Sequence, residues 1–392
     1  MRQYDVVIAG GAMAGGTLAL ALEHLSQGDM RIAVVEPFKA QSDAHPGFDS
    51  RSIALSYGTV NLLRHLQLWS ALEPFATPIE HIHVSDRFHA GMTAITKQEV
   101  GVEALGYVVE LADVGRVYQA LLTERVTIDF FCPDSVTSIA REQDFTNVTL
   151  SSGETLTAKL IVAADGAVSQ CCQLIGLTQV EHDFDQVAVI ANVVTQEAHQ
   201  GRAFERFTEN GPVALLPMSD NRMSLVWCLS PQQAETVMGL SDRDFLARLQ
   251  QDFGWRLGAM TKVGQRASYP LLLKQRKQNI SHRFAIVGNA AQTLHPIAGQ
   301  GFNLGIRDVM SLAEEVAKQR DDAGRYQGLM RFSQRRDADR CETIWLTSSL
   351  VHVFSNDLPA MRFGRNVALA AMDNLSLLKQ PLLRQTLGLV KR

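Results

Sequence analysis

The sequence predicts an α/β protein in which a mainly parallel sheet with helices is interleaved with a mainly antiparallel sheet, followed by C-terminal helices. Three observations support this prediction. The first 36 residues alternate strand, glycine turn, helix and strand, residues 183–275 alternate apolar and polar side chains, and the last 50 residues carry apolar residues at helical spacing. Neither a linker nor a fixed-period repeat divides the 392 residues, so we expect interleaved domains.

The first 36 residues have the pattern of a dinucleotide-binding βαβ unit. A strand-like run over 4–9 leads into a glycine-rich turn, helical spacing follows over 17–25, and a second strand over 31–35 ends at Glu36. Glycines allow a tight turn and a close approach to a pyrophosphate at the helix start, and an acid about 20 residues further on suits a ribose hydroxyl. The segment therefore predicts a Rossmann-like nucleotide site.

Each turn residue has an expected role in this site. Gly10 would form the tight turn, Gly15 would let helix and strand approach, and Ala12 departs from the pattern because glycine usually stands there. The competing interpretation is the apolar core of a secretory signal over 6–22. It is disfavoured by the glycines, by Asp5 at the start of the run and by the absence of a convincing cleavage site.

Two later segments complete the candidate site. A buried strand near 160 delivers Asp165 and Gly166 into a turn, which alone is usually an ordinary strand end. After a short apolar run at 284–287, the residues Gly299-Gln300-Gly301 open an amphipathic helix. Backbone N–H groups crowd around a ligand at such a helix start and favour negative charge. This suits a flavin, whose reduced ring is anionic near N1 and O2.

Together the three segments resemble the single-component, FAD-dependent aromatic hydroxylases, the family that includes p-hydroxybenzoate hydroxylase, over nearly the whole chain. Within that family, the runs 45–51, 203–207 and 288–305 are most similar to the hydroxylases of ubiquinone biosynthesis. Most relatives carry Gly-Asp-Ala-Ala-His where this chain has Gly-Asn-Ala-Ala-Gln at 288–292. Asn289 can still hydrogen-bond the ribityl chain. Cys172 stands where many relatives place an arginine, and we attach no role to it.

The resemblance implies a reaction and a cofactor. NAD(P)H reduces FAD, the reduced flavin adds O2 to form a C4a-hydroperoxide, and the distal oxygen passes to a polyprenylated methoxyphenol ring in ubiquinone biosynthesis. The resemblance also implies the following FAD-binding residues: Gly10, Gly11, Ala12, Gly15, Glu36, Arg51, Asp165, Gly166, Asn289, Gly299, Gln300, Gly301, Phe302 and Asn303.

Three residues are expected to take part in catalysis. Pro296 would stiffen the wall where oxygen reacts, and Arg51 would contact the flavin phosphate or ring edge. His295 is a candidate base for phenol deprotonation, although a histidine there can equally be a structural hydrogen-bonding group. His45 is a weaker candidate for the same role.

Composition excludes several other classes of protein. The net charge of −4 argues against a nucleic-acid binder. Five cysteines without a Cys-x-x-Cys pair indicate reduced thiols and a cytoplasmic location, and we expect no metal site because no histidine–cysteine cluster has zinc spacing. Only one dinucleotide fingerprint is present, so NAD(P)H is expected to bind transiently.

The expected domain limits follow the motifs. We assign 1–75, 106–182 and 276–330 to the FAD-binding domain, 76–105 and 183–275 to the substrate domain, and 331–392 to a C-terminal helical region. Strands are expected at 82–84, 107–109, 127–131, 147–150, 187–194, 203–207, 213–216 and 223–229, and helices at 114–122 and 241–253.

The last 50 residues allow two interpretations. From Thr343 onward they hold six basic residues and two acids: Arg362, Arg365, Lys379, Arg384, Lys391 and Arg392, and Asp357 and Asp373. A cationic amphipathic tail can lie on an anionic membrane, where a polyprenylated phenol would be met, within an assembly of other ubiquinone-biosynthesis proteins. The favoured interpretation is a pair of helices that packs across the two domains.

Three rival functions remain open at this level. A flavin-dependent halogenase would carry a paired-tryptophan motif, which the chain lacks because Trp227 and Trp255 stand apart. A plain NAD-dependent dehydrogenase would leave residues 165–166 and 286–308 unexplained. A non-catalytic flavoprotein scaffold would be consistent with Ala12 and Asn289. A related hydroxylase that acts at another ring carbon is a further alternative.

Overall fold

The computed structural model describes residues 2–39, 51–87, 91–354 and 376–390, together with 364, 366, 368, 371 and 373. The mainly parallel sheet has the order β18-β19-β11-β1-β2-β8. Its parallel strands are β19 (Phe284–Ile286), β11 (Thr155–Ala163), β1 (Arg2–Ala9), β2 (Ile32–Val35) and β8 (Ile128–Phe131). The antiparallel strands β18 (Ile280–Ser281), β10 (Thr146–Leu150) and β9 (Val136–Arg141) extend it.

The parallel strands end at one edge of this sheet. Ala9 at the end of β1 is paired with Ala163 in β11 and with Val35 in β2, and Ala163 is paired with Ile286 in β19. The turns that follow these four strands therefore share one edge. Ligands of open α/β sheets bind at this edge, beyond the carboxyl ends of the strands.

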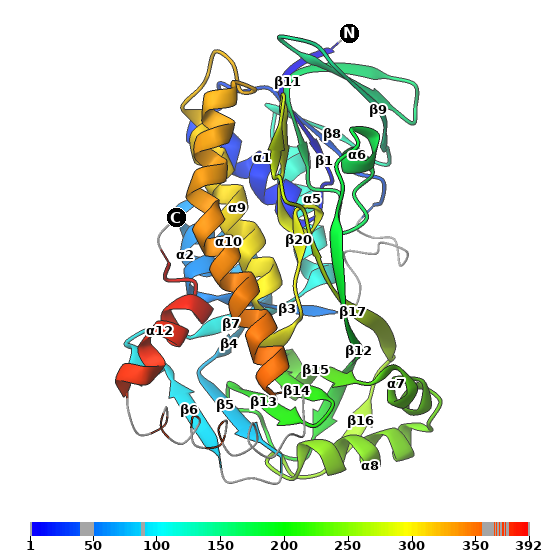
Figure 1. The fold of residues 1–392 in the computed structure, drawn as a ribbon, viewed down its shortest axis with the longest axis vertical. Coiled ribbons are helices and arrows are strands. Elements are labelled where there is room, and N and C mark those ends of the chain that lie inside the picture. The colour runs from blue at the N-terminus through cyan, green and yellow to red at the C-terminus, as the bar shows by residue number, and fades with distance from the viewer. Residues whose placement is uncertain are drawn as a thin grey trace.

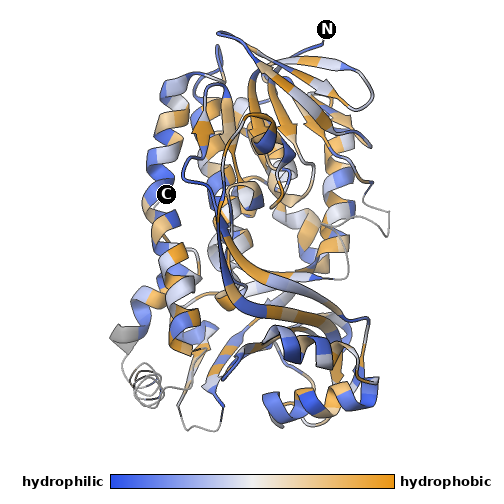
Figure 2. Ribbon diagram, turned by 45° about the vertical axis from the view of Figure 1, so that its right-hand side comes forward, coloured by the Kyte–Doolittle hydropathy of each residue, from blue (hydrophilic) through white to orange (hydrophobic). Residues whose placement is uncertain are grey.

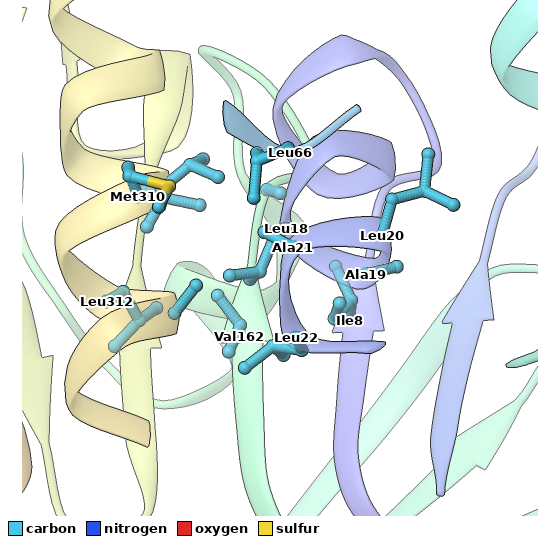
Figure 3. Packing of buried hydrophobic residues seen from close by; sticks show 14 of the residues in the cluster. Ile8, Leu18, Ala19, Leu20, Ala21, Leu22, Leu66, Val162, Met310 and Leu312 are labelled. Atoms are coloured by element: carbon cyan, nitrogen blue, oxygen red, sulfur yellow. The ribbon is translucent and has the colours of Figure 1, made fainter. Parts of the chain in front are cut away.

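Two helices that lie far apart in the sequence pack against each other beside the sheet. α1 (Met13–Ser26) follows β1, and α9 (Gln300–Ala317) contacts it along its length. Figure 3 shows Leu18 and Leu22 of α1 close to Val162 of the sheet, with Met310 and Leu312 of α9 facing them. Figure 2 shows the same concentration of hydrophobic residues in the strands of this sheet.

α9 is more deeply buried than its sequence predicts. The pattern predicts an amphipathic helix with a solvated face, but 14 of its 18 residues are buried. The polar face is covered by α10 (Tyr326–Phe354), which runs beside α9 along the long axis of the molecule (Figure 1). Buried ion pairs between the two helices make this packing compatible with the charges of α9.

The second sheet is mainly antiparallel, as predicted. Its order is β20-β17-β12-β15-β14-β13-β5-β6, and β16 pairs with β12. These strands are β20 (Gln292–Thr293), β17 (Ala267–Gln275), β12 (Val180–Thr195), β15 (Arg222–Leu229), β14 (Gly211–Pro217), β13 (Arg202–Thr208), β5 (His81–Asp86), β6 (Met92–Thr96) and β16 (Met260–Val263). Segments from 81–96 and from 180–293 thus meet in one sheet, which confirms the interleaving of two α/β units.

One face of the second sheet is covered by α7 (Pro231–Met238) and α8 (Asp242–Phe253). Trp227 of β15 and Phe245 of α8 are fully buried in this core and meet edge to face. The predicted cap of α8 is confirmed, because the Ser241 hydroxyl accepts a hydrogen bond from the Asp244 N–H at 3.2 Å. The other face of the sheet lies toward the nucleotide-binding unit.

Smaller elements join the two units. A short sheet of order β3-β7-β4 is formed by β3 (Ser52–Ser56), β7 (Gly106–Glu110) and β4 (Thr77–Ile79). The helices α2 (Tyr57–His65), α3 (Trp69–Leu72) and α4 (Lys97–Val100) belong to this part. α5 (Leu111–Glu124) packs against α1, and α6 (Gln170–Leu174) lies beside β9. α5 matches the predicted helix at 114–122.

The C-terminal segment returns to the junction of the two units. α12 (Ser376–Thr386) places Leu383 in a cluster with Leu105 and Met218, and the Gly58 N–H donates to Leu387 O at 2.8 Å. Lys379 is buried and bonds to Ala94 O. Of the predicted tail charges, Arg362, Arg365, Lys391, Arg392 and Asp357 lie outside the described residues. Among the helices described, none has the length and hydropathy to cross a bilayer.

Candidate active site

Two glycines set the geometry of the first turn. Gly10 has φ +100°, and a Cβ built on it would lie 2.4 Å from Ala164 O at the end of β11. A Cβ on Gly15 would lie 1.9 Å from Gly10 O, so α1 contacts the turn backbone directly. A Cβ at either position would clash with backbone atoms, so only glycine fits there. These contacts agree with the roles that the sequence predicts for the two positions.

Glu36 lies at the end of β2 and faces the same turn. It is 4% exposed, and its carboxylate accepts hydrogen bonds from the Gly11 N–H at 2.7 Å and from the Phe38 N–H at 3.0 Å. The two bonds fix the carboxylate at the carboxyl edge of the sheet. A carboxylate oxygen accepts more than one hydrogen bond, so these two bonds are compatible with binding of a ribose hydroxyl.

A third glycine position brings the distant segments together. Gly288 has φ +63°, and a Cβ on it would lie 2.9 Å from Ala14 Cβ in α1. A Cβ on Gly305 of α9 would lie 3.1 Å from the Gly288 Cα. The starts of α1 and α9 and the turn after β19 therefore converge. The sequence motif contains Gly288 and Gly305, but their contact is visible only in the fold.

The starts of α1 and α9 lack side-chain caps. Ala12 and Gly299 occupy the N-cap positions, and neither has a polar side chain for the orphan N–H groups. A Cβ on Gly301 would meet nothing within 4 Å, so the protein leaves space beside the first turn of α9. Unsatisfied donors at a helix start bind anions. These residues fit the phosphates and the anionic ring edge of a flavin dinucleotide.

The side chains of Asn289 and Asp165 differ in whether other residues of the protein already hydrogen-bond to them. Asn289 is exposed at the turn after β19, and among the described residues its side chain has no hydrogen-bond partner. The Asp165 carboxylate instead accepts from the Ser169 hydroxyl at 2.5 Å and from the Cys171 N–H at 2.9 Å, at the start of α6. Gly166 follows with φ +84° and open space around it. Asp165 thus anchors α6, a function that spacing alone does not indicate.

Asn303 and Gln300 of α9 direct their side chains into the protein. Asn303 Oδ1 accepts from the Ser56 N–H at 2.9 Å and the Thr59 hydroxyl at 2.7 Å, and its Nδ2 donates to Ala54 O and Gly299 O. Gln300 is 1% exposed and donates to Ala298 O and Thr386 O. Both side chains tie α9 to neighbouring elements, so they offer the cofactor their backbone only.

Phe302, a further predicted cofactor-binding residue at the start of α9, has a partly apolar environment. Phe302 is half-buried and packs against the core that surrounds α1 and α9. Arg51 lies directly before β3, and its carbonyl accepts from the Leu111 N–H at 2.9 Å. Residues 40–50, including the weaker base candidate His45, lie outside the described residues.

His295 is buried with both ring nitrogens engaged. Nδ1 accepts a hydrogen bond from the Ile297 N–H at 3.2 Å, and Nε2 lies 2.9 Å from Gln186 Oε1. Because Nδ1 acts as an acceptor, Nε2 carries the proton and donates to Gln186. Burial lowers the pKa of His295 to about 4, and Phe184 packs edge-on against the ring. The neutral imidazole fixes the turn that contains Pro296.

Gln292, which stands where most relatives of the resembled family carry histidine, belongs to a buried polar network. Its amide nitrogen donates to Asp308 Oδ2 at 2.7 Å, and its oxygen accepts from Arg340 Nε at 3.0 Å. Arg336 Nε donates to the other oxygen of Asp308 at 2.7 Å. Gln292 therefore connects the second sheet to α9 and α10.

Cys171 and Cys172 are buried in the core beside β11. Burial raises the pKa of both thiols. Among the described residues, no group of histidine, cysteine, aspartate and glutamate has the arrangement of a metal site.

Comparison with known proteins agrees with this site. A family model described as "FAD binding domain" matches residues 3–342. The chain is 34% identical to the ubiquinone hydroxylase UbiL of Rhodospirillum rubrum, over 99% of this chain and 90% of the relative. It is 31% identical to the 3-demethoxyubiquinol 3-hydroxylase of Escherichia coli, over 98% of each chain.

A solved structure shows the same fold. The p-nitrophenol 4-monooxygenase PnpA of Pseudomonas putida matches with a TM-score of 0.81 at 19% identity, over 99% of both chains. The resemblance drawn from residues 203–207 and 288–305 is confirmed by the curated relatives, and FAD is the cofactor of this family. The chain therefore belongs to the FAD binding domain family and is an FAD-dependent monooxygenase.

Proposed function

We propose that this enzyme hydroxylates a polyprenylated methoxyphenol ring in ubiquinone biosynthesis, with NAD(P)H as reductant and O2 as co-substrate. The similarity to UbiL over 99% of the chain is the observation that carries the proposal. The two relatives are named a ubiquinone hydroxylase and a 3-demethoxyubiquinol 3-hydroxylase.

Each residue of the site has its own role in holding the cofactor. When bound, FAD supplies the reduction of O2 and the activated oxygen that the ring accepts. Glu36 holds the ribose, Asn289 the ribityl chain, and the first-turn N–H groups of α1 and α9 the phosphates and the anionic ring edge. Pro296 stiffens the turn beside the ring, and Arg51 binds the flavin phosphate or ring edge.

His295 acts in this proposal as a positioning residue. Its two hydrogen bonds hold the turn that leads to Gly299, and its low pKa leaves little capacity to take up a proton near neutral pH. This differs from the sequence interpretation in which His295 deprotonates the phenol. The histidine keeps the start of α9 in the orientation that binds the flavin.

A second candidate is hydroxylation at another carbon of the same ring. The E. coli relative, 31% identical, is named for the 3-position of demethoxyubiquinol, which supports this second candidate. The two candidates share cofactor, reductant and residues. They differ in the phenol that is consumed.

The enzyme must also reach an apolar substrate. Trp255 and Trp345 are large hydrophobic side chains with exposed fractions of 72% and 71%. We infer a peripheral contact with the membrane that holds the polyprenylated phenol. Flotation with anionic vesicles tests this contact, and protein that stays at the bottom of the gradient contradicts it.

The central experiment measures flavin and product together. The purified protein should be yellow or become yellow with added FAD, and a polyprenylated 2-methoxyphenol should stimulate NAD(P)H oxidation. Mass spectrometry of the product identifies the ring carbon that gained oxygen. A colourless protein after reconstitution refutes the proposal. Flavin binding with no phenol-dependent oxidation indicates a scaffold, and turnover of demethoxyubiquinol alone selects the second candidate.

A further inference from the structure

Glu205 is a carboxylate in the interior that the proposed roles leave unused. It lies on β13, and its Oε1 accepts a hydrogen bond from the Ala298 N–H at 3.4 Å. Ala298 precedes Gly299, the N-cap of α9, and it has the positive φ of 56° that residues other than glycine seldom adopt. Glu205 therefore touches the turn that leads into the flavin-binding helix start.

The row of residues paired across the sheet beside Glu205 is apolar. Glu205 is paired with Ala214 in β14, Ala214 with Val226 in β15, and Val226 with Ile190 in β12. These four residues are only half-buried, whereas their neighbours on the opposite face form the core under α7 and α8. The row continues on the other side of Glu205 with the half-buried Val84 of β5. Small and aliphatic side chains that keep accessible surface around one carboxyl suit an apolar ring bearing one hydroxyl.

The environment of Glu205 sets its proton affinity. Although the side chain keeps some accessible surface, protein surrounds the carboxyl closely, and this burial raises the pKa of Glu205 to about 7, against the smaller opposing effect of the Ala298 bond. A group with such a pKa both accepts and releases a proton at neutral pH. Catalytic acids and bases are often tuned in this way.

Among the other titratable groups near Glu205, Asp86 shares its face of the sheet, and the others are neutral or face elsewhere. From β15, the Cys228 thiol is buried and its pKa is raised, so it stays protonated. The turn contributes His295, which is neutral. By register, Asp86 of β5 lies on the same face two residues beyond the partner of Glu205, and it accepts from Asn366. Within β13, Arg206 alternates to the opposite face and donates to Asp252 O.

We infer that Glu205 is the catalytic base that takes the proton from the phenol hydroxyl of the substrate. This inference rests on the proposed function. The O–H bond of the phenol breaks, an O–H bond forms on the carboxylate, and the electron pair stays on the phenol oxygen. The resulting charge makes the ring more electron-rich where oxygen is added. The carboxyl later releases the proton to solvent.

Substitutions of Glu205 distinguish a role as catalytic base from a role that only holds the turn in place. Glu205→Gln keeps an oxygen that accepts from the Ala298 N–H but cannot take up a proton, whereas Glu205→Ala removes both functions. Glu209→Gln, an exposed carboxylate directly after β13, is the matched control. FAD affinity is measured for each variant by flavin fluorescence, so that loss of the cofactor is not mistaken for loss of the base.

The pH profile of phenol hydroxylation gives the main result. In the wild type, kcat/KM should rise with pH through a midpoint near 7, because only the ionised Glu205 accepts the proton. In Glu205→Gln, kcat/KM should fall about 100-fold or more at pH 8 and lose this limb, with unchanged FAD affinity. Glu209→Gln should match the wild type.

A spectroscopic measurement needs no turnover. Infrared difference spectra of the oxidised, FAD-loaded protein upon binding of 2-methoxyphenol should show a carboxyl C=O band that changes in the wild type and is absent in Glu205→Gln. A Glu205→Gln variant with the rate, pH profile and spectrum of the wild type overturns the inference and leaves the proposed function intact. A wild type that binds FAD but hydroxylates no phenol refutes the proposed function itself.

Discussion

Arg307 and Asp339 form a buried ion pair that joins α9 to α10. Two guanidinium nitrogens of Arg307 lie 2.7 and 3.1 Å from the two carboxylate oxygens, and neither side chain is more than 3% exposed. Asp339 also pairs with Arg336. Burial by itself raises the pKa of Asp339, but the hydrogen bonds and charges of the two arginines hold it below its usual value.

Asp339→Asn should therefore destabilise the fold strongly. It leaves the buried Arg307 without its carboxylate partner, while Arg336 keeps Asp308, so we expect the free energy of unfolding to fall by about 3–5 kcal/mol. Urea denaturation measures this change. Asp29→Asn, which breaks an exposed ion pair with Arg320, should cost less than about 1 kcal/mol. Equal costs for the two variants would contradict the role assigned to the buried pair.

The two asparagines of the site should respond differently to substitution. Asn303→Ala removes three hydrogen bonds between α9 and the segment 54–59 and one to Gly299 O, and it should lower the free energy of unfolding by about 2–4 kcal/mol. Asn289→Ala alters an exposed side chain, so stability should change by less than about 0.5 kcal/mol while FAD affinity falls. Thermal unfolding of the apoprotein and flavin titration measure the two effects, and the reverse pattern would refute the assignment.

Gly301→Ala tests the open space at the start of α9. Because the added methyl meets no atom of the chain within 4 Å, the apoprotein should keep its stability. The methyl would project toward the bound flavin, and we expect the FAD dissociation constant to rise about tenfold, which is about 1.4 kcal/mol. Gly239→Ala, whose methyl would meet atoms no closer than 3.6 Å, is the matched glycine away from the site. An unchanged FAD affinity in Gly301→Ala would place the flavin elsewhere.

The neutral state of His295 gives a pH dependence of stability. Its pKa in the folded protein, about 4, lies below the ordinary value of 6.5, so the unfolded chain binds the proton first. The stability that this histidine contributes is complete above pH 6.5 and declines as the pH falls toward 4. His295→Gln should lose less stability than the wild type between pH 7.5 and 5, measured by urea unfolding. His352→Gln, an exposed histidine, should follow the wild type.

Local sequence patterns predicted the parts of the fold that depend only on short segments of the chain. Gly10, Gly15 and Glu36 stand at positions that a βαβ turn requires, because φ > 0, a helix–strand contact and a strand end are local properties. Alternation of side chains likewise predicted β13, β14 and β15. The similarity of residues 288–305 to a known family indicated the flavin, which periodicity alone would not.

The tertiary structure decided the roles of individual side chains. Gln300 and Asn303 stand in the motif, yet neighbouring elements occupy their side chains, and His295 meets Gln186, 109 positions away. α9 is buried on its polar side because α10 supplies the countercharges. The proton affinity of Glu205 depends on burial between two units. Such properties arise from contacts between residues far apart in sequence, whose partners and desolvation are fixed only when the chain has folded.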